Sequence, residues 1–405
     1  MKIMKTVHAI GAVALREVRE ILADRWTLVA VTIMPFIVGV LLTAMYANRI
    51  VADLPLGVID EDGSATSRAV YRALDAHQTL TAVPVDEPAA NAESVLRGGA
   101  YAGLVVIPSG FEQKLKQGQQ STVLCYINNS NMVAGNALLK AAGTTVGTIA
   151  VGSAAQKANR SGALGQSGMA LAQPVIVQAR PLFNPAQNYS DFFVPGILAA
   201  LLQQVVVIGA ALTWVREFRT GRMAELMEMT GSMGAIAAGK LLVYTAIGAF
   251  WAVVLFFGLF SLVGVPYTGS VLAGVVSTIL MIVAMGLVAM MISSFFEHRE
   301  TAIQITFIVS SPAFLVSGYT FPAFAMTAPA RWAGYLVPLT PFLTAWRRLV
   351  LYGAGWADIA GQLGVLLVMI AVTACIMMLR LRMRVYGGTA AAPASIQHTS
   401  PSSGM

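Results

Sequence analysis

The stretch Val271–Phe295 reads VLAGVVSTILMIVAMGLVAMMISSF and contains no charged side chain. A helix of about 20 apolar residues crosses the hydrocarbon core of a bilayer, and this stretch is long enough to do so. Five further stretches share this character, at about Trp26–Tyr46, Phe192–Trp214, Leu241–Val263, Ala302–Phe321 and Ile359–Leu379. The sequence therefore predicts an α-helical polytopic membrane protein with six transmembrane helices.

The composition agrees with membrane insertion. Hydrophobic residues make up 57% of the chain and charged residues 11%, whereas a soluble domain carries about 25% charged residues. The segment Met1–Asp24 spreads its charges over a helical pattern, and no small-residue cleavage site follows the first apolar run. The first span is therefore expected to remain as an anchor.

The positions of Lys and Arg predict the orientation. Outside the long segment at residues 47–190, thirteen of the sixteen Lys and Arg lie in the terminal segments and in alternate short loops, and cytoplasmic loops carry such an excess. Both termini are therefore expected in the cytoplasm, with residues 47–190 outside. The formal net charge of +7 follows from this topology. The basic residues are not clustered with stacking aromatics, so nucleic-acid binding is not indicated.

The long segment between the first two spans has the composition of a soluble domain. Residues 47–190 are predicted to form a mixed α/β extracytoplasmic domain inserted between helices 1 and 2. The expected strands are Leu56–Asp60, Ala102–Ile107 and Thr122–Ile127, and the expected helices are Ser64–Leu74 and Phe111–Lys116. A further helix is expected from Val133, loosening around the glycine-containing segment Ser161–Gly168.

One motif suggests nucleotide binding and is rejected. Gly234–Lys240 fits G-x-x-x-x-G-K, but Leu241 follows where a Ser or Thr hydroxyl is needed for magnesium. Lys240 is instead expected to anchor the inner end of the third helix at the lipid headgroups. The histidines and cysteines have neither catalytic nor metal-ligand spacing. No catalytic residue, metal ligand or cofactor is therefore assigned to this chain, and an enzyme is not expected.

The spans contain no ionisable side chain beyond their ends, whereas ion-driven transporters place such groups inside the membrane. The strongly polar side chains at depth are Gln203, Gln204 and Gln304, which suit hydrogen bonds between helices. The energy for transport is therefore expected to come from a source outside the membrane.

Two amphipathic segments flank the spans. Residues 1–25 are expected to be an interfacial cytoplasmic helix, with Trp26 as an anchor before the first span. The loop at residues 215–240 contains Arg216–Met233, in which Met223 and Leu226 recur at helical spacing beside charged residues. This helix could lie on the inner membrane surface or in the groove of a partner.

The segment before the last span is irregular. Phe321–Trp356 is too short for two crossings and contains several prolines, which break helices. Residues 322–356 are therefore predicted to form a re-entrant helical hairpin in the outer leaflet, where irregular backbone must face protein or a water-filled path. The tail at residues 387–405, rich in Ala, Ser, Pro and Thr, is expected to be disordered.

Three motifs carry a family resemblance. Gly318–Gly355 contains Gly, Phe-Pro, a Pro before Arg-Trp, Pro-x-x-Pro, an Arg and a final Gly. Phe183-Asn184-Pro185 and Phe193-Val194-Pro195-Gly196 precede and open the second span, and the loop Arg216–Lys240 contains spaced glycines. These features resemble the ABC-2 type permeases, the transmembrane subunits of type V ABC exporters, in the subgroup with a large periplasmic domain.

The resemblance implies partners and residue roles. A separate cytoplasmic ABC ATPase would bind ATP and magnesium, and a second permease, either a copy or a paralogue, would complete the transporter. A periplasmic adaptor protein often joins this subgroup. The implied ATPase-coupling residues are Glu217, Arg219, Gly221, Arg222, Glu225 and Leu226. The implied residues of the outer gate in the hairpin are Pro322, Pro329, Pro338, Pro341 and Arg347.

The expected function is therefore that of the permease subunit of an ATP-driven exporter. Apolar spans favour a hydrophobic or amphiphilic substrate, such as a drug or a lipid-like molecule. A sodium-export permease or another ABC-2 permease is an alternative. A membrane-anchored receptor or scaffold is a more distant one, because six helices and a hairpin exceed what an anchor needs.

Overall fold

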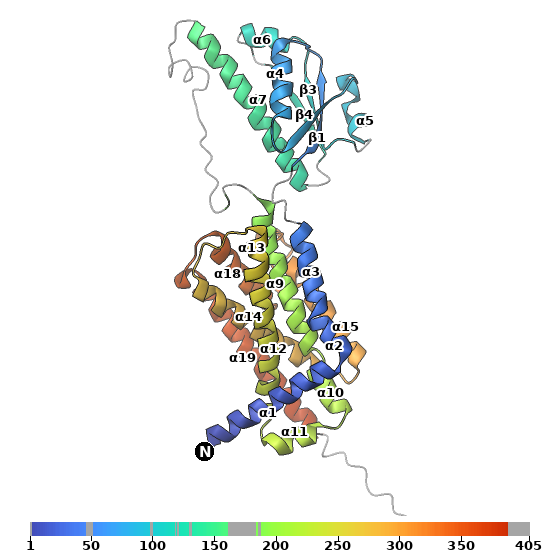
Figure 1. Ribbon diagram of the computed structural model, residues 1–405, viewed down its shortest axis with the longest axis vertical. Helices are drawn as coiled ribbons and strands as arrows, with labels where there is room; N and C mark the ends of the chain where they lie inside the picture. The colour runs from blue at the N-terminus through green and yellow to red at the C-terminus, as the bar shows by residue number, and fades with distance from the viewer. Residues whose placement is uncertain are drawn as a thin grey trace, which may run out of the picture. The chain divides into compact units, whose positions relative to one another are not determined.

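The computed structural model describes residues 2–45, 52–97, 100–117, 119, 121–128, 132–160, 184 and 188–387 (Figure 1). The chain divides into a helical unit, Met1–Ala47 with Ser190–Met405, and an α/β unit, Asn48–Tyr189. The tail after Gly387 and the segment Ser161–Gly168 lie outside the described residues.

Five helical stretches in the described part of the chain are long and apolar enough to cross a membrane. They are Arg25–Met45, Tyr189–Arg219, Met233–Val263, Val271–Ser293 and Trp356–Val385. The remaining predicted span, Ala302–Phe321, is divided into α15 (Arg299–Ser310) and α16 (Ala313–Val316). Pro312 lies at the division, where its missing N–H removes a helical hydrogen bond.

The first span shows how a proline is accommodated in the bundle. It consists of α2 (Arg25–Val31) and α3 (Ile33–Met45). Pro35 has no N–H to donate to the carbonyl of Val31, and the indole Nε1 of Trp251 donates to that carbonyl instead, at 2.6 Å. A backbone group that a bilayer could not satisfy is thus satisfied by a neighbouring helix.

The third span begins earlier than the sequence predicted. Its helix α12 (Met233–Ala252) starts after Ser232, whose hydroxyl accepts the N–H of Ala235 at 3.4 Å as an N-cap. The span continues through the π-helix η2 (Val253–Leu259) into α13 (Phe260–Val263), and α14 (Val271–Ser293) follows. Lys240 therefore lies two turns inside the helix instead of at its start.

Two of the three glutamines join helices as expected. From α9 (Tyr189–Ala210), Gln203 Nε2 donates to the carbonyl of Ser310 at 2.9 Å, and the Ser310 hydroxyl donates to Gln204 Oε1 at 2.9 Å. Gln304 is exposed. The prediction is therefore confirmed for Gln203 and Gln204, which connect α9 to the end of α15.

Short helices occupy the segment before the last span. After the 3-10 turn η3 (Ala323–Ala325) come α17 (Ala328–Tyr335), the largely buried α18 (Leu339–Leu351) and the long α19 (Trp356–Gly387). Helix α18 packs on α14 and α19, so this segment is an integral part of the helical unit.

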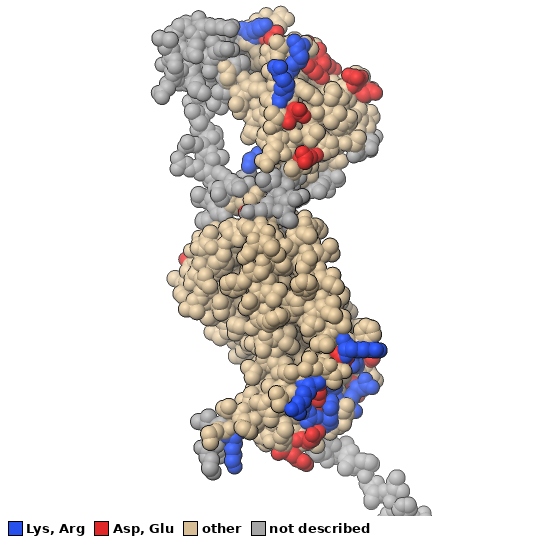
Figure 2. All heavy atoms as spheres, in the orientation of Figure 1, with Lys and Arg blue, Asp and Glu red and all other residues tan. Residues whose placement is uncertain are grey.

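One end of the helical unit, called here the basic end, is formed by α1 (Lys2–Ala23), α10 (Thr213–Arg219) and α11 (Met223–Thr230). Helix α1 packs along α12, and α11 packs on both. Figure 2 shows Lys and Arg side chains gathered at this end and a broad, largely uncharged face of the helical unit beyond it.

The α/β unit is built on a four-stranded mixed sheet. The strands β1 (Leu54–Asp60), β2 (Leu80–Pro84), β3 (Gly103–Ile107) and β4 (Leu124–Ile127) are ordered β2-β1-β3-β4. β1 pairs in parallel with β2 and β3, and β4 is antiparallel to β3. Strand β2 was not predicted, because its five residues end in a proline and alternate too briefly to signal a strand.

Helices cover both faces of this sheet. The helices α4 (Ala65–Asp75), α6 (Phe111–Gln117) and α7 (Met132–Arg160) lie over one face, and α5 (Ala92–Arg97) lies over the other (Figure 1). Val58 contributes to the first core and its neighbour Ile59 to the second, as the period of two along a strand requires.

Candidate functional site

A close helix crossing shapes the basic end. Where α1 passes over α12, a Cβ on Gly239 would come within 2.8 Å of the carbonyl oxygen of Ile10. Only a residue without a side chain allows the two backbones to approach this closely. The glycine that completed the false nucleotide motif is therefore explained by helix packing, and the crossing brings Glu17 of α1 to Lys240 of α12.

Lys240 is the centre of a buried ion network. Its side chain is 1% exposed, its Nζ pairs with Glu17 Oε2, and the same Nζ lies 2.7 Å from Glu217 Oε1. The prediction that Lys240 reaches the lipid headgroups is therefore wrong. A buried ammonium is stable where carboxylates neutralise it, and two helices supply them here.

Glu17 receives three donors. Besides Lys240, the Tyr244 hydroxyl donates to Glu17 Oε1, and Arg216 Nη2 donates to the same oxygen at 2.6 Å. Burial raises the pKa of the Glu17 carboxyl, but attraction to Lys240 and Arg216 outweighs it and holds the pKa below the ordinary value of 4.5. Glu17 is therefore ionised at neutral pH.

A more exposed ring of charges surrounds this centre. Arg216 Nε lies 2.9 Å from Glu20 Oε2, and Arg222 Nη1 lies 3.2 Å from Glu20 Oε1. Arg16 Nη1 lies 3.2 Å from Glu225 Oε1, which links α1 to α11. The network therefore joins α1, α10, α11 and α12 into one charged cluster.

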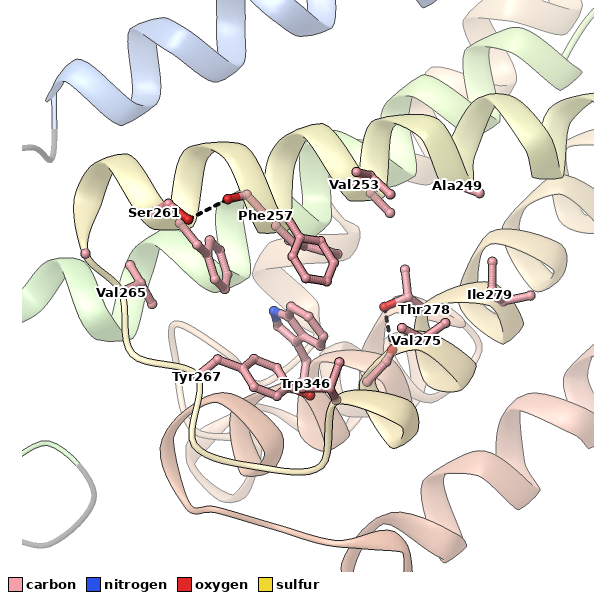
Figure 3. A pocket seen from close by; sticks show the side chains of 16 residues that line it. Ala249, Val253, Phe257, Ser261, Val265, Tyr267, Val275, Thr278, Ile279 and Trp346 are labelled. Atoms are coloured by element: carbon pink, nitrogen blue, oxygen red, sulfur yellow. Dashed lines mark hydrogen bonds between the residues drawn. The ribbon is translucent and has the colours of Figure 1, made fainter.

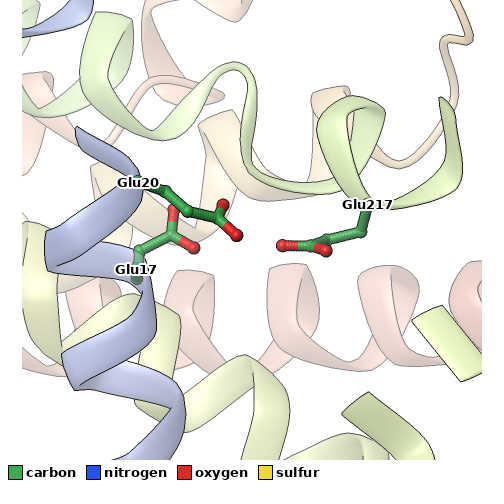
Figure 4. A group of neighbouring side chains, drawn as sticks. All are labelled: Glu17, Glu20 and Glu217. Atoms are coloured by element: carbon green, nitrogen blue, oxygen red, sulfur yellow. The ribbon is translucent and has the colours of Figure 1, made fainter. Parts of the chain in front are cut away.

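The three carboxylates of the cluster could in principle hold a metal ion. Figure 4 shows Glu17, Glu20 and Glu217 turned toward one another, and one oxygen of each lies within 4.8 Å of the others. Lys240 and Arg216, however, already donate to these carboxylates. The cluster thus supplies its own cations, and its chemistry does not call for a metal.

The residues predicted to couple to an ATPase fall into two groups. Arg219, Gly221 and Glu225 are exposed at the basic end, with Arg222 partly so. Glu217 is 0% exposed and Leu226 is fully buried. The carboxylate of Glu217 therefore faces the interior of the helical unit, and the exposed residues alone present a surface to a partner.

The amphipathic loop packs its apolar face against the core of the helical unit. It forms two helices, because Gly221, with φ 66°, ends α10 in a left-handed turn before α11 begins. Met223 and Leu226 belong to the core of the helical unit. Neither is available to a lipid surface or a partner's groove in this structure, so both alternatives are wrong for these two side chains.

A second cluster lies at the opposite end, around Arg347 of α18. Its Nη2 donates to the carbonyl of Tyr319 at 2.7 Å, and its guanidinium lies 4.3 Å from the Tyr319 ring centroid. The Tyr319 hydroxyl donates to the carbonyl of Phe192 at 2.6 Å, and the two rings stack. Arg347 thereby joins α18 to the start of α9.

The four prolines of this region all stand where short helices begin. Pro322 precedes η3 and Pro338 precedes α18, whereas Pro329 and Pro341 lie within the first turns of α17 and α18. A missing N–H is tolerated at such positions. These prolines therefore define the helix boundaries, and Arg347 makes the polar contacts between segments.

Sequence reasoning missed Glu17. Its signal was present, because Val13, Glu17 and Ile21 recur every four residues on one face of α1, which places one carboxylate on an otherwise apolar face. The partner of that carboxylate could not be found from sequence, since Lys240 is 223 positions away.

The five apolar helices of spanning length in the described part of the chain are typical of a polytopic membrane protein. The family model described as ABC-2 family transporter protein matches residues 25–379, and this chain belongs to that family.

Two relatives in Escherichia coli strain K12 are similar over most of their length. The probable multidrug ABC transporter permease YbhS is 23% identical over 352 residues, covering 85% of this chain and 89% of the relative. The probable multidrug ABC transporter permease YbhR is 23% identical over 377 residues, covering 90% and 96%. The chain is thus similar to permeases along nearly its whole length.

Proposed function

We propose that this chain is the permease subunit of an ATP-driven exporter, energised by a separate cytoplasmic ATPase that binds ATP and magnesium. The observation that carries the proposal is the network of Glu17, Glu217 and Lys240. It fixes α1, α10 and α12 to one another directly beneath an exposed, charged loop. A receptor that uses its helices only as anchors has no need of such a connection.

The network offers a route for mechanical coupling. The ATPase would contact the exposed residues Arg219, Gly221 and Glu225. A displacement of that loop would move Glu217, which is paired with Lys240 within the third span, and so would shift α12. Glu217 thus acts as a positioning residue behind the contact surface.

The cargo is proposed to be hydrophobic or amphiphilic. Two lines of support are the largely uncharged face of the helical unit (Figure 2) and the naming of both relatives as probable multidrug permeases. Transport confined to small inorganic ions would contradict this assignment and favour a sodium-export permease.

The proposed setting is the bacterial inner membrane. The basic end would face the cytoplasm together with both termini, and the α/β unit would lie in the periplasm, where an adaptor protein could bind. The segment at α15 and α16 would complete a sixth, interrupted crossing. The pair α17 and α18 would form the re-entrant hairpin, with Arg347 and the four prolines at an outer gate. A second permease, identical or paralogous, would complete the transporter.

An affinity pull-down from gently solubilised native membranes, read by mass spectrometry, tests the proposal. We expect an ABC ATPase to be recovered with the wild-type chain and lost with the double variant Arg219→Glu/Glu225→Lys. Arg382→Glu, an exposed charge reversal on α19, is the matched control and should retain the ATPase. Clean recovery of the wild-type chain without any ATPase would make a receptor or scaffold the better assignment.

A further inference from the structure

A small pocket with a basic lining lies at the basic end of the helical unit. It is formed where the start of the first span, the end of α10 and the start of α15 meet. Its lining includes three arginines, one carboxylate and two buried apolar side chains, from Arg216, Arg219, Arg299, Asp24, Leu212 and Val215. The volume is about 250 Å³, just below the range of about 300–1,000 Å³ for drug-sized ligands. The pocket therefore suits a small charged group.

The charge of this lining distinguishes it from a larger apolar cavity between the third and fourth spans. That cavity, of about 490 Å³, has aromatic and aliphatic walls and no charged side chain among the described residues that line it (Figure 3). Its Ser261 and Thr278 hydroxyls donate to backbone carbonyls one helical turn before them. The apolar cavity thus selects no particular ligand, whereas the basic pocket offers three guanidinium groups.

The charges of the basic pocket do not cancel. Arg219 is exposed in the last turn of α10, and its guanidinium forms no ion pair or hydrogen bond with any described residue. A guanidinium is always charged in proteins and carries five N–H donors. Arg219 therefore adds an uncompensated positive charge and a free set of donors to the pocket.

The carboxylate of Asp24 is occupied by other donors. It accepts the N–H groups of Trp26 at 3.1 Å and Thr27 at 3.4 Å, the Thr27 hydroxyl at 3.0 Å, and Nη2 of Arg299. Burial raises the pKa of this carboxyl, but hydrogen bonds from Arg299 and Thr27 outweigh it and hold the pKa below the ordinary value of 3.8. The carboxylate thus positions Arg299, whose side chain is 40% exposed and whose Nε and Nη1 have no acceptor among the described residues.

Arg216 is held by carboxylates that do not line the pocket. Its Nε and Nη2 pair with Glu20 and Glu17 of α1, and its Nη1 has no acceptor among the described residues. A guanidinium that is already fixed through two of its nitrogens loses little further side-chain freedom when a ligand binds to the third. Arg216 is therefore a preorganised donor at the inner wall of the pocket.

The pocket lies at the depth expected for lipid headgroups. Asp24 directly precedes the first span, Arg25–Met45, and Arg216 and Arg219 belong to the last turn of the second, Tyr189–Arg219. Trp26 is 70% exposed next to Asp24, and tryptophans at span ends are typical of the membrane interface. A lipid headgroup therefore reaches these arginines without leaving the membrane surface.

We propose that this pocket binds a phosphate group, carried by an anionic membrane lipid or by a soluble phosphate ester, between the guanidinium groups of Arg219, Arg299 and Arg216. Phosphate presents its anionic oxygens in a tetrahedral arrangement, so it accepts from more than one guanidinium at once, whereas a planar carboxylate matches a single one. The apolar side chains of Leu212 and Val215 lower the local dielectric constant and strengthen these contacts. The site goes beyond the proposed export function, since it requires neither an ATPase nor a cargo.

Native mass spectrometry of the detergent-solubilised full chain tests the site. The protein is titrated with phosphatidylglycerol and, separately, with phosphatidylcholine of the same acyl chains, and the dissociation constants are compared. Both lipids contain a phosphodiester, but the choline ammonium of the second cancels its charge. We expect phosphatidylglycerol to bind at least severalfold more tightly. Equal affinity would overturn the proposal, and because no ATPase is present, the result is independent of the proposed function.

Two substitutions locate the binding. Arg219→Gln and Arg299→Gln each remove one guanidinium and should raise the dissociation constant for phosphatidylglycerol about tenfold, the lower end of the range for one hydrogen bond to a charged group. Arg382→Gln, at an exposed arginine of α19 outside the pocket, is the matched control and should leave it unchanged. Thermal unfolding checks that each variant is folded, and Arg219→Gln breaks no contact within the described part of the chain. Unchanged affinity in folded Arg219→Gln, or an equal loss in Arg382→Gln, would overturn the proposal.

A competition distinguishes the two sources of the phosphate group. Phosphatidylglycerol is bound first, and glycerol phosphate is then added in excess. Displacement of the lipid would support the site and show that a soluble phosphate ester is a sufficient ligand. Retention of the lipid, together with its dependence on Arg219 and Arg299, would support the site and assign it to the lipid headgroup.

Discussion

Gly239 and Val13 meet where α1 crosses α12, and a Cβ on Gly239 would lie 2.7 Å from the Cβ of Val13. This approach is closer than two side chains allow. Because Glu17 lies one turn after Val13 and Lys240 follows Gly239 directly, the crossing sets the position of the buried ion pair. The close packing of α1 against α12 at Gly239 thus sets the positions of the charged groups at the basic end.

Gly239→Ala is expected to weaken this crossing. The added methyl group would overlap with Val13, and overpacking of this kind costs about 1–3 kcal/mol. We expect a lower midpoint in thermal unfolding of the detergent-solubilised protein. Gly234→Ala on the same helix is the control, since its Cβ would meet only Ser232 Oγ, at 3.6 Å. Equal midpoints for the two variants would show that the crossing tolerates a side chain.

Lys240→Met should be more damaging. It removes the cation shared by Glu17 and Glu217 and leaves buried carboxylates with too little compensation, at a cost of about 3–5 kcal/mol. The measurement is again the thermal midpoint, with the exposed Lys5→Met as control. Neutralising the carboxylates together with Lys240, as Glu17→Gln/Glu217→Gln/Lys240→Met, should recover part of the loss. No recovery would indicate that the ion pairs are not the main contribution of Lys240.

The depressed pKa of Glu17 predicts sensitivity to acid. A carboxyl whose pKa is lower in the folded than in the unfolded state stabilises the fold above its unfolded value, and this contribution is lost as pH falls through the folded value. The thermal midpoint should therefore decrease as pH falls below the ordinary value of 4.5. Glu17→Gln should show a smaller decrease over the same range, although it is less stable at neutral pH. Parallel curves for the two proteins would contradict the assignment.

Gly196→Ala tests the cluster at the opposite end. A Cβ at Gly196 would come within 2.3 Å of the Tyr319 ring, which stacks on Phe192 and lies beneath Arg347. We expect displacement of the ring, a loss of about 1–3 kcal/mol in stability and reduced efflux of hydrophobic dyes from cells. Gly361→Ala, with open space around its Cβ, is the control.

A double-mutant cycle identifies the cause of that loss. If the clash with Tyr319 is responsible, Gly196→Ala should cost less in a Tyr319→Leu background than in the wild-type chain. An equal cost in both backgrounds would place the effect elsewhere on α9.

Arg347→Lys should not be a conservative change. A lysine can keep one hydrogen bond to the carbonyl of Tyr319, but it loses the planar stacking on the tyrosine ring. We expect reduced dye efflux at normal membrane abundance, measured against Arg348→Lys, whose guanidinium is exposed and donates to the carbonyl of Asp358. Equal efflux by the two variants would argue against a role for Arg347 at a gate.

The sequence predicted which helices and strands form better than it predicted the residues at which they begin and end. Five of the apolar stretches are helices of spanning length, because length and apolar character are local properties. The start of the third span was predicted too late, at Leu241, because Met233–Lys240 was expected to belong to a loop. In the structure Ser232 caps α12, and the helix begins at Met233. The break at Pro312 could be read from the proline, but its consequence for the span depends on the contacts of Ser310 with α9.

The sequence by itself determined that this protein lies in a membrane and that an α/β unit follows the first span, because hydropathy and strand alternation are local properties of consecutive residues. Only the tertiary structure decided that Lys240 is buried instead of reaching the headgroups, and that Glu17 and Glu217 neutralise it. These residues are far apart in the chain, so no local pattern connects them. Their ion pairs exist because α1 can approach α12 at Gly239.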